Sequence, residues 1–197
     1  MKAGLAETVS VVLNPQLMGM AAVVLIALFS PHGHGSLDSG AALVLGLLLL
    51  TVAPVFETIG DVLVGRINIS FEKREKRDEF YSDWMLFFSV AVIAFLVLDS
   101  PTMLALSLVF AETNALLWLI NRYWTKLSLH SAAVTGFTSS VIMVLGWSWW
   151  WIYLLVIPVW WSRLTLGAHD LRQLVLGAAA AWVPAFVTYG FFFGSAF

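Results

Sequence analysis

The stretch Ala41–Val64, AALVLGLLLLTVAPVFETIGDVLV, decides the class of fold. No charged side chain occurs in it before Glu57, and it is long enough for a helix to cross the roughly 30 Å hydrocarbon core of a bilayer. The whole composition agrees, because 60% of the 197 residues are apolar and 11% are charged, against about 25% charged in soluble domains. The sequence therefore predicts an integral membrane protein whose surface mostly faces lipid.

Six further apolar runs are bounded by charges, proline or glycine in the same way. Together they predict an all-α, polytopic helix bundle with six or seven transmembrane helices. Spans of this length use up the chain, so residues 1–197 are expected to form a single integral membrane domain. The expected spans are roughly 15–30, 41–64, 84–99, 101–122, 131–147, 149–163 and 170–193.

Alternation along these spans sorts the loops between two membrane faces. Segments 65–83, 122–130 and 163–170 fall on one face, and all ten Lys and Arg residues lie there. The positive-inside bias predicts that this face is cytoplasmic, in a multi-pass protein of the cell's inner membrane. The same cations could instead be present to bind a ligand. Tryptophans near the span ends, including Trp84, Trp124 and Trp147, are expected to be interface anchors.

Two histidines, His130 and His169, each begin a span on the basic face. A tight turn brings Arg163 and His169 together at the level of the lipid headgroups. Gln173 follows one helical turn later, where its side-chain oxygen can accept the imidazole Nδ1 proton. Phosphoryl transfer needs such a set: cations for the phosphoryl oxygens, a nucleophile, and an acid for the leaving oxygen.

The spacing of these residues resembles a motif of the type 2 phosphatidic acid phosphatase family. The third motif of that family is Ser-Arg, five residues, His, three residues, Asp. This chain has Ser162-Arg163, five residues, His169, three residues and Gln173, so it departs from the motif only at the last position.

The other two motifs of the family are matched in part. The second, Pro-Ser-Gly-His, corresponds to Leu127-Ser128-Leu129-His130, which keeps the Ser and the His. The first, a Lys followed after six residues by Arg-Pro, has no clean copy. Arg77 is the nearest candidate for its Arg and Lys73 for a second cation, although Asp78 stands where proline is expected.

The resemblance implies a role for each matched residue. His169 would attack phosphorus to form a phosphohistidine, His130 would protonate the leaving oxygen, and Arg163 and Ser128 would hold phosphate oxygens. Gln173 replaces an Asp that orients the nucleophile and stabilises its positive form. A neutral amide stabilises an imidazolium less, so either the rate is reduced or Asp170 assists.

Further cations on the same face complete the expected substrate-binding set. These are Lys126, Arg77, Lys73 and Arg122. The resemblance implies no metal and no other cofactor. Small residues such as Gly177 are expected to let the helices approach closely around the site.

Ionisable groups elsewhere in the spans are assigned to structure. Glu57 and Asp61, four residues apart, are expected to pair with Arg66 or Arg122, with a Mg²⁺ site as the alternative. The Gly-rich turn that holds His32 and His34 is expected to be a loop with satisfied side chains rather than a metal site.

The sequence thus predicts a membrane phosphatase that hydrolyses a lipid phosphate or isoprenyl diphosphate at the membrane interface. Its partners would be a membrane lipid substrate and the bilayer, and a net charge of -2 disfavours nucleic acid. The oligomeric state stays open. The alternative is a transporter or lipid-binding protein without enzymatic activity, whose cations capture an anionic headgroup.

Overall fold

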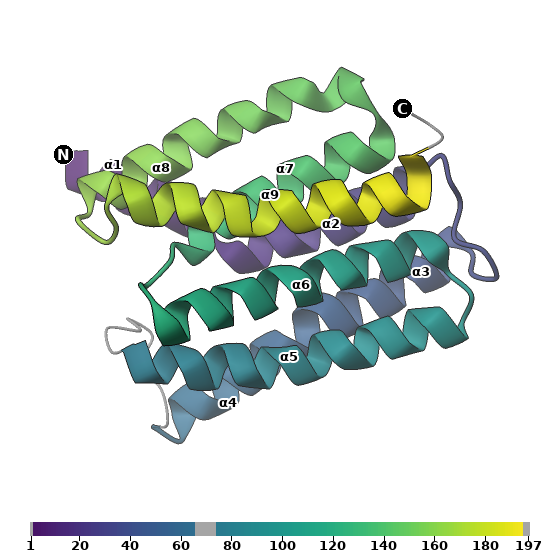
Figure 1. Ribbon diagram of the computed structural model, residues 1–197, viewed down its shortest axis with the longest axis horizontal. Helices are drawn as coiled ribbons and strands as arrows, with labels where there is room; N and C mark the ends of the chain where they lie inside the picture. Colours follow the sequence, from purple (N-terminus) through teal and green to yellow (C-terminus); the bar gives the residue numbers. More distant parts are fainter. Residues whose placement is uncertain (1, 66–73, 195–197) are drawn as a thin grey trace.

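In the computed structural model, which describes residues 2–65 and 74–194, every element of secondary structure is helical. The all-α prediction is therefore confirmed for these residues. The helices run lengthwise along the bundle (Figure 1). Their bounds are α1 (Lys2–Val12), α2 (Pro15–Phe29), α3 (Ser39–Leu47), η1 (Leu48–Val52), α4 (Ala53–Leu63), α5 (Arg74–Val97), α6 (Pro101–Tyr123), α7 (Leu129–Leu145), η2 (Trp147–Leu155), α8 (Val156–Thr165) and α9 (Leu171–Phe193).

Several of these helices have the length and composition of membrane spans. In the described part of the chain there are four, or five when the bent pair of α1 and α2 is counted as one. The expected number of six or seven is not confirmed, because α7 has only 17 residues, or about 26 Å at 1.5 Å per residue. The long spans are Ser39–Leu63, Arg77–Val97, Pro101–Tyr123 and Leu171–Phe193.

The span Ser39–Leu63 is one continuous helix with an irregular centre. A π-helical turn, η1, separates α3 from α4 and ends at Val52, two residues before Pro54. Proline has no backbone N–H, so a wider turn at this point accommodates the missing helical hydrogen bond. The stretch that predicts the class of fold therefore crosses the bundle unbroken.

The helix α1 is not among the expected elements. Its two buried residues, Ala6 and Ser10, lie one turn apart, and the helix packs against α8. Asn14 then caps α2 through its side chain, and Pro15 occupies the first helical turn, so the chain bends by 40° between the two helices. The bend places Ser10 beside the ends of α7 and α8.

The two ends of the bundle differ in charge, as the alternation of loops predicts. One end holds the N-terminus, the end of α6, the start of α7 and the turn from α8 to α9 (Figure 1). We call it the basic end, since it carries Lys2, Arg77, Arg122, Lys126 and Arg163. The α2–α3 loop, the α5–α6 turn and the end of α9 lie at the opposite end.

The start of α7 and the start of α9 are held in direct contact. A Cβ at Gly177 would lie 2.6 Å from the Ser128 carbonyl oxygen, so a residue without a side chain is required there. The Ser131 hydroxyl donates to the Leu174 carbonyl at 2.7 Å, and Ser128 N donates to the Gln173 carbonyl at 3.3 Å. These contacts fix the first two turns of α9 beside the residues that begin α7.

The tryptophans divide between interface and interior. Trp124, Trp147 and Trp150 are exposed, as expected of anchors in the headgroup region. Trp84, for which the same role was expected, is buried instead. Its indole N–H donates to Thr58 Oγ1 at 3.0 Å, because an aromatic side chain inside the bundle needs a partner for its polar atom.

Candidate active site

A cavity of about 260 Å³ lies at the basic end, with room for several water molecules. It is lined by four nitrogen-bearing side chains that the sequence analysis nominated, Arg77, His130, Arg163 and His169. No carboxylate belongs to its described lining. The remaining lining residues are Asn14, Pro15, Gln16, Phe80, Tyr81 and Leu129. We call this space the polar cavity.

His169 lies in the turn between α8 and α9, and α9 orients its ring. Asp170 Oδ1 accepts the backbone N–H of Gln173 at 2.8 Å and so caps the helix. This cap places the Gln173 side chain over the turn, with Oε1 2.9 Å from His169 Nδ1. The distance fits the hydrogen bond expected from the spacing, in which Nδ1–H donates and the lone pair remains on Nε2.

The surroundings of His169 favour the neutral imidazole. Burial is the main cause, and together with the positive charges of Arg77, Arg163 and Lys126 it lowers the pKa to about 4. The hydrogen bond to Gln173 acts in the opposite direction and is outweighed. At neutral pH the ring is therefore uncharged and able to act as a nucleophile.

Ser10 joins Arg163 to His130. Arg163 Nη1 donates to Ser10 Oγ at 2.7 Å, and His130 Nε2 lies 3.2 Å from that same oxygen. The Ser10 carbonyl oxygen is also 3.2 Å from His130 Nε2. Sequence reasoning missed Ser10, because a single serine in an apolar stretch carries no motif. The sequence signal that could have found it is the pair of small residues Ala6 and Ser10, which lie one helical turn apart on the same face.

Arg163 is a cation that the protein only partly satisfies. Its Nε is buried and has no hydrogen-bond partner among the described residues. Buried donors of charged groups are usually paired, so the guanidinium retains capacity for an acceptor. Arg77 stands at the same cavity and donates from Nη1 to the Leu127 carbonyl at 3.3 Å, which ties α5 to the start of α7.

Three other residues expected to bind substrate do not line the polar cavity. Ser128 is fully buried, and its hydroxyl caps α7 by accepting the backbone N–H of Ser131 at 3.3 Å. Lys126 is exposed and donates to the Ala168 carbonyl at 3.2 Å. Arg122 forms an ion pair with Asp78 at 3.3 Å. These residues join the elements around the cavity, and their side chains are committed to protein partners.

Asp78, which stands where the family has proline, has a structural contact of its own. It accepts a hydrogen bond from Asn121 Nδ2 at 2.7 Å as well as the Arg122 guanidinium. It therefore fastens the start of α5 to the end of α6. Lys73, the remaining expected cation, lies outside the described residues, and so does Arg66.

A separate group of carboxylates occurs away from the polar cavity. One oxygen from each of Glu57, Asp61 and Asp83 lies within 4.8 Å of the others. Glu57 and Asp61 were expected to pair with Arg66 or Arg122, whereas the described ion pair of Arg122 is with Asp78. None of the three carboxylates lines the polar cavity.

The histidines at the opposite end have protein partners. His34 Nε2 lies 2.8 Å from the Ala27 carbonyl oxygen, and the His32 ring stacks on Phe193 with 4.1 Å between centroids. These contacts agree with the expected loop, except that His34 Nδ1 is buried without a hydrogen-bond partner among the described residues.

Comparisons of the chain with protein-family models, with curated proteins and with solved structures find no match. The residues of the polar cavity are therefore the basis for assigning a function.

Proposed function

We propose that this chain is an integral membrane phosphatase that hydrolyses a phosphate or diphosphate ester of a lipid alcohol through a histidine nucleophile. The observation that carries the proposal is the polar cavity, in which Arg77, Arg163, His130 and His169 converge without a lining carboxylate. A concave site lined by guanidinium and imidazole groups is complementary to a phosphate, and a neutral imidazole in the same site supplies a nucleophile.

The geometry supports a mechanism in two steps. Arg163 and Arg77 bind phosphoryl oxygens, and His169 Nε2 attacks phosphorus as the bond to the ester oxygen breaks. The electron pair leaves with that oxygen, which takes a proton from the imidazolium form of His130, a form that the bound anion favours. In the second step His130 takes a proton from water, the water oxygen forms a bond to phosphorus, and the P–N bond breaks, which restores neutral His169.

Gln173 gives this mechanism a distinctive feature. Its amide oxygen fixes the tautomer of His169, and it adds no negative charge to stabilise the positive ring of the phosphohistidine. Asp170, the nearest carboxylate in sequence, is used as the cap of α9. We therefore expect catalysis to be slower than with a carboxylate at position 173.

We also propose that the polar cavity lies on the cytoplasmic side of the inner membrane. The support is the position of the cations, since Lys2, Arg122 and Lys126 lie at the same end as the cavity although none of them lines it. Cations that do not contribute to a site fit the positive-inside bias better than ligand binding does. The substrate would then be a lipid phosphate of the cytoplasmic leaflet.

The test is phosphate release by the full chain in detergent or lipid nanodiscs, over a panel of lipid phosphates and isoprenyl diphosphates with a chelator present. We expect release by the wild type and a loss of more than about 100-fold in His169→Ala. His32→Ala, a change of the same kind at the opposite end, is the matched control and should retain full release.

Other outcomes would contradict the proposal in different ways. Undiminished release by His169→Ala would exclude the nucleophile. Release abolished by the chelator would favour the carboxylate group of Glu57, Asp61 and Asp83 with a metal ion. Saturable binding of lipid phosphates without release would favour the transporter alternative.

A further inference from the structure

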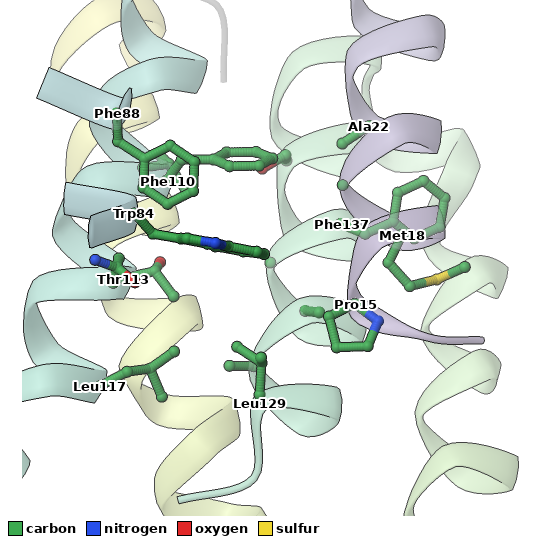
Figure 2. Close-up of a pocket in the computed structure, with 17 residues that line it drawn as sticks. Pro15, Met18, Ala22, Trp84, Phe88, Phe110, Thr113, Leu117, Leu129 and Phe137 are labelled. Atoms are coloured by element: carbon green, nitrogen blue, oxygen red, sulfur yellow. The ribbon is translucent and has the colours of Figure 1, made fainter. Parts of the chain in front are cut away.

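A second cavity lies deeper in the bundle, between α2, α5, α6 and α7, with a volume of about 80 Å³. Figure 2 shows Trp84, Phe88 and Phe110 on one side of it, and Met18 and Phe137 on the other. The lining contains no charged residue among those described. We call this space the apolar slot.

The apolar slot adjoins the polar cavity. Pro15 and Leu129 line both spaces, so these two residues lie at the boundary between the polar cavity and the slot. Figure 2 shows Pro15 and Leu129 together at the edge of the slot, beyond Met18 and Trp84. For a molecule with its phosphate beside Arg163 and His169, the slot beyond Leu129 is therefore a neighbouring space with mostly apolar lining.

The two spaces have opposite chemistry, and a phosphate ester of a hydrocarbon chain has the same two parts. The polar cavity supplies guanidinium and imidazole groups for the anion, whereas the slot supplies aromatic and aliphatic side chains. A lipid chain gains little by exchanging bilayer for protein, since both are apolar. The benefit is positional, because the slot keeps the chain in apolar surroundings while the phosphate is held in line with the nucleophile.

We propose that the apolar slot holds a short segment of one hydrocarbon chain of the phosphate ester whose phosphate binds in the polar cavity. The inference depends on the proposed function for the phosphate, and it adds the place and number of the chains. A volume of about 80 Å³, less than three times the roughly 30 Å³ of a water molecule in the liquid, has room for a few methylene groups of one chain, so a second chain of the same lipid remains in the bilayer.

Gly19 of α2 determines how much of the slot is open. A Cβ at this position would lie 3.4 Å from Phe110 Cε1 and 3.9 Å from Thr51 Cγ2. A longer side chain at position 19 would therefore extend toward the Phe110 ring and occupy the slot. Gly190 of α9 is the matched control, since a Cβ there would meet nothing within 4 Å.

The first experiment maps the chain directly. The full-length protein is irradiated with a dodecyl phosphonate that carries a diazirine at the middle of its chain, and the adducts are located by mass spectrometry. We expect adducts on α2 and α6, near Met18 and Phe110, that excess unlabelled dodecyl phosphonate removes. Gly19→Leu should reduce them at least fivefold, and Gly190→Leu should leave them unchanged.

Two results would overturn the inference. One is a wild-type map confined to lipid-facing residues such as Ile93 and Val97. The other is an unchanged map in a folded Gly19→Leu variant. The wild-type map decides the question even when a variant misfolds.

The second experiment separates this inference from the proposed function. Hydrolysis of dodecyl phosphate is compared with that of phenyl phosphate, which has no chain to place in the slot. We expect Gly19→Leu to lose at least tenfold in kcat/KM for dodecyl phosphate and less than twofold for phenyl phosphate. Equal rates for the variant and the wild type on both esters would refute the slot and leave the phosphatase intact. No release from either ester by the wild type would refute the phosphatase, and the adduct map would still test the slot.

Discussion

The Gln173 side chain determines how much positive charge His169 can carry. Its oxygen accepts from Nδ1 at 2.9 Å, and the pKa of His169 is nevertheless lowered to about 4, chiefly by burial. If neutral His169 is the nucleophile, the acid limb of kcat/KM lies where the pH drops through about 4. The acid limb lies at this low pH because Gln173, the hydrogen-bond partner of His169, carries no negative charge that would raise the pKa of the ring.

The substitution Gln173→Asp should change both the rate and this limb. A carboxylate at hydrogen-bond distance favours the imidazolium, so it raises the pKa of His169 and moves the acid limb up by about one pH unit or more. It also stabilises the phosphohistidine, so we expect kcat at pH 7 to rise several-fold. The measurement is the pH dependence of phosphate release.

Gln173→Ala serves as the comparison for this prediction. It removes the orienting oxygen without adding a charge, so kcat should fall while the acid limb does not move to higher pH. An acid limb that stays at the same pH in Gln173→Asp would show that His169 does not control it.

Ser10 acts on two groups of the polar cavity at once. Its hydroxyl accepts from Arg163 at 2.7 Å and contacts His130 at 3.2 Å. Hydrogen bonds to charged groups contribute about 1.5 to 3 kcal/mol. We expect Ser10→Ala to lower kcat/KM about tenfold, with the loss divided between KM, through Arg163, and kcat, through His130.

The control for Ser10 is a second hydroxyl of the same helix. Thr8 is exposed, and its Oγ1 donates at 3.0 Å to the carbonyl of Gly4 in its own helix. Thr8→Ala should leave kcat/KM within twofold of the wild type. Equal losses in the two variants would mean that α1 as a whole, and not the Ser10 hydroxyl, matters for activity.

Among individual residues, sequence reasoning identified those whose chemistry is local and missed those whose role depends on packing. The positions of His169 and Gln173 follow from the spacing of one helical turn, and the structure places them in contact. Whether the Ser128 hydroxyl faces the cavity depends on where α7 begins, and here it is used as the cap. Ser10 belongs to a helix whose contact with α8 no local pattern specifies.

Among helix boundaries too, the sequence predicts those that depend on local composition and misses those that depend on the surroundings of the helix. Apolar runs located α2, α6 and α9 to within a few residues, because lipid requires continuous apolar surface there. The sequence predicts that the third span starts at 84, whereas α5 begins at Arg74. Its first turns are charged and lie at the basic end, where a helix can continue beyond the apolar region.

The contact between α7 and α9 predicts a sharp effect of a single methyl group. Gly177→Ala would place a Cβ 2.6 Å from the Ser128 carbonyl oxygen, and backbone cannot yield as a flexible side chain can. Overpacking of this kind costs about 1 to 3 kcal/mol. We expect a lower Tm by thermal unfolding and lower activity, since the starts of α7 and α9 carry His130 and adjoin His169.

Gly190→Ala is the same change in the same helix, with open space around the new Cβ. Alanine is the better helix former by about 1 kcal/mol, so this variant should be as stable as the wild type or more stable. A Gly177→Ala variant that equals it in Tm and activity would contradict the close approach of α9 to Ser128.

At the scale of the whole molecule, the number of crossings depends on the hairpin of α7, η2 and α8. Its tip lies at the end of the bundle opposite the polar cavity, on the same side as the α2–α3 loop (Figure 1). The helix α7 is about 26 Å long, slightly less than the hydrocarbon core, and most of it is buried against neighbouring helices. Composition alone therefore does not separate a crossing hairpin from a re-entrant one.

Cysteine labelling resolves this question cleanly, because the chain contains no native Cys. Three exposed positions are each changed to Cys in an active protein: Tyr123 at the basic end, Ser39 at the opposite end, and Ser148 at the tip of the hairpin. An impermeant maleimide added to intact cells should label Ser39→Cys, and Tyr123→Cys only after permeabilisation. Labelling of Tyr123→Cys in intact cells would reverse the proposed orientation.

Ser148→Cys then decides the topology. The exposed tryptophans beside it, Trp147, Trp150 and Trp151, suit an interface, and a tip that stopped inside the hydrocarbon core would leave their indole N–H groups without water. We therefore expect Ser148→Cys to react in intact cells at the same rate as Ser39→Cys, which means that α7 and α8 both cross. A residue that reacts in neither condition would place the tip within the membrane and reduce the crossings by two, with the polar cavity on the same side in either case.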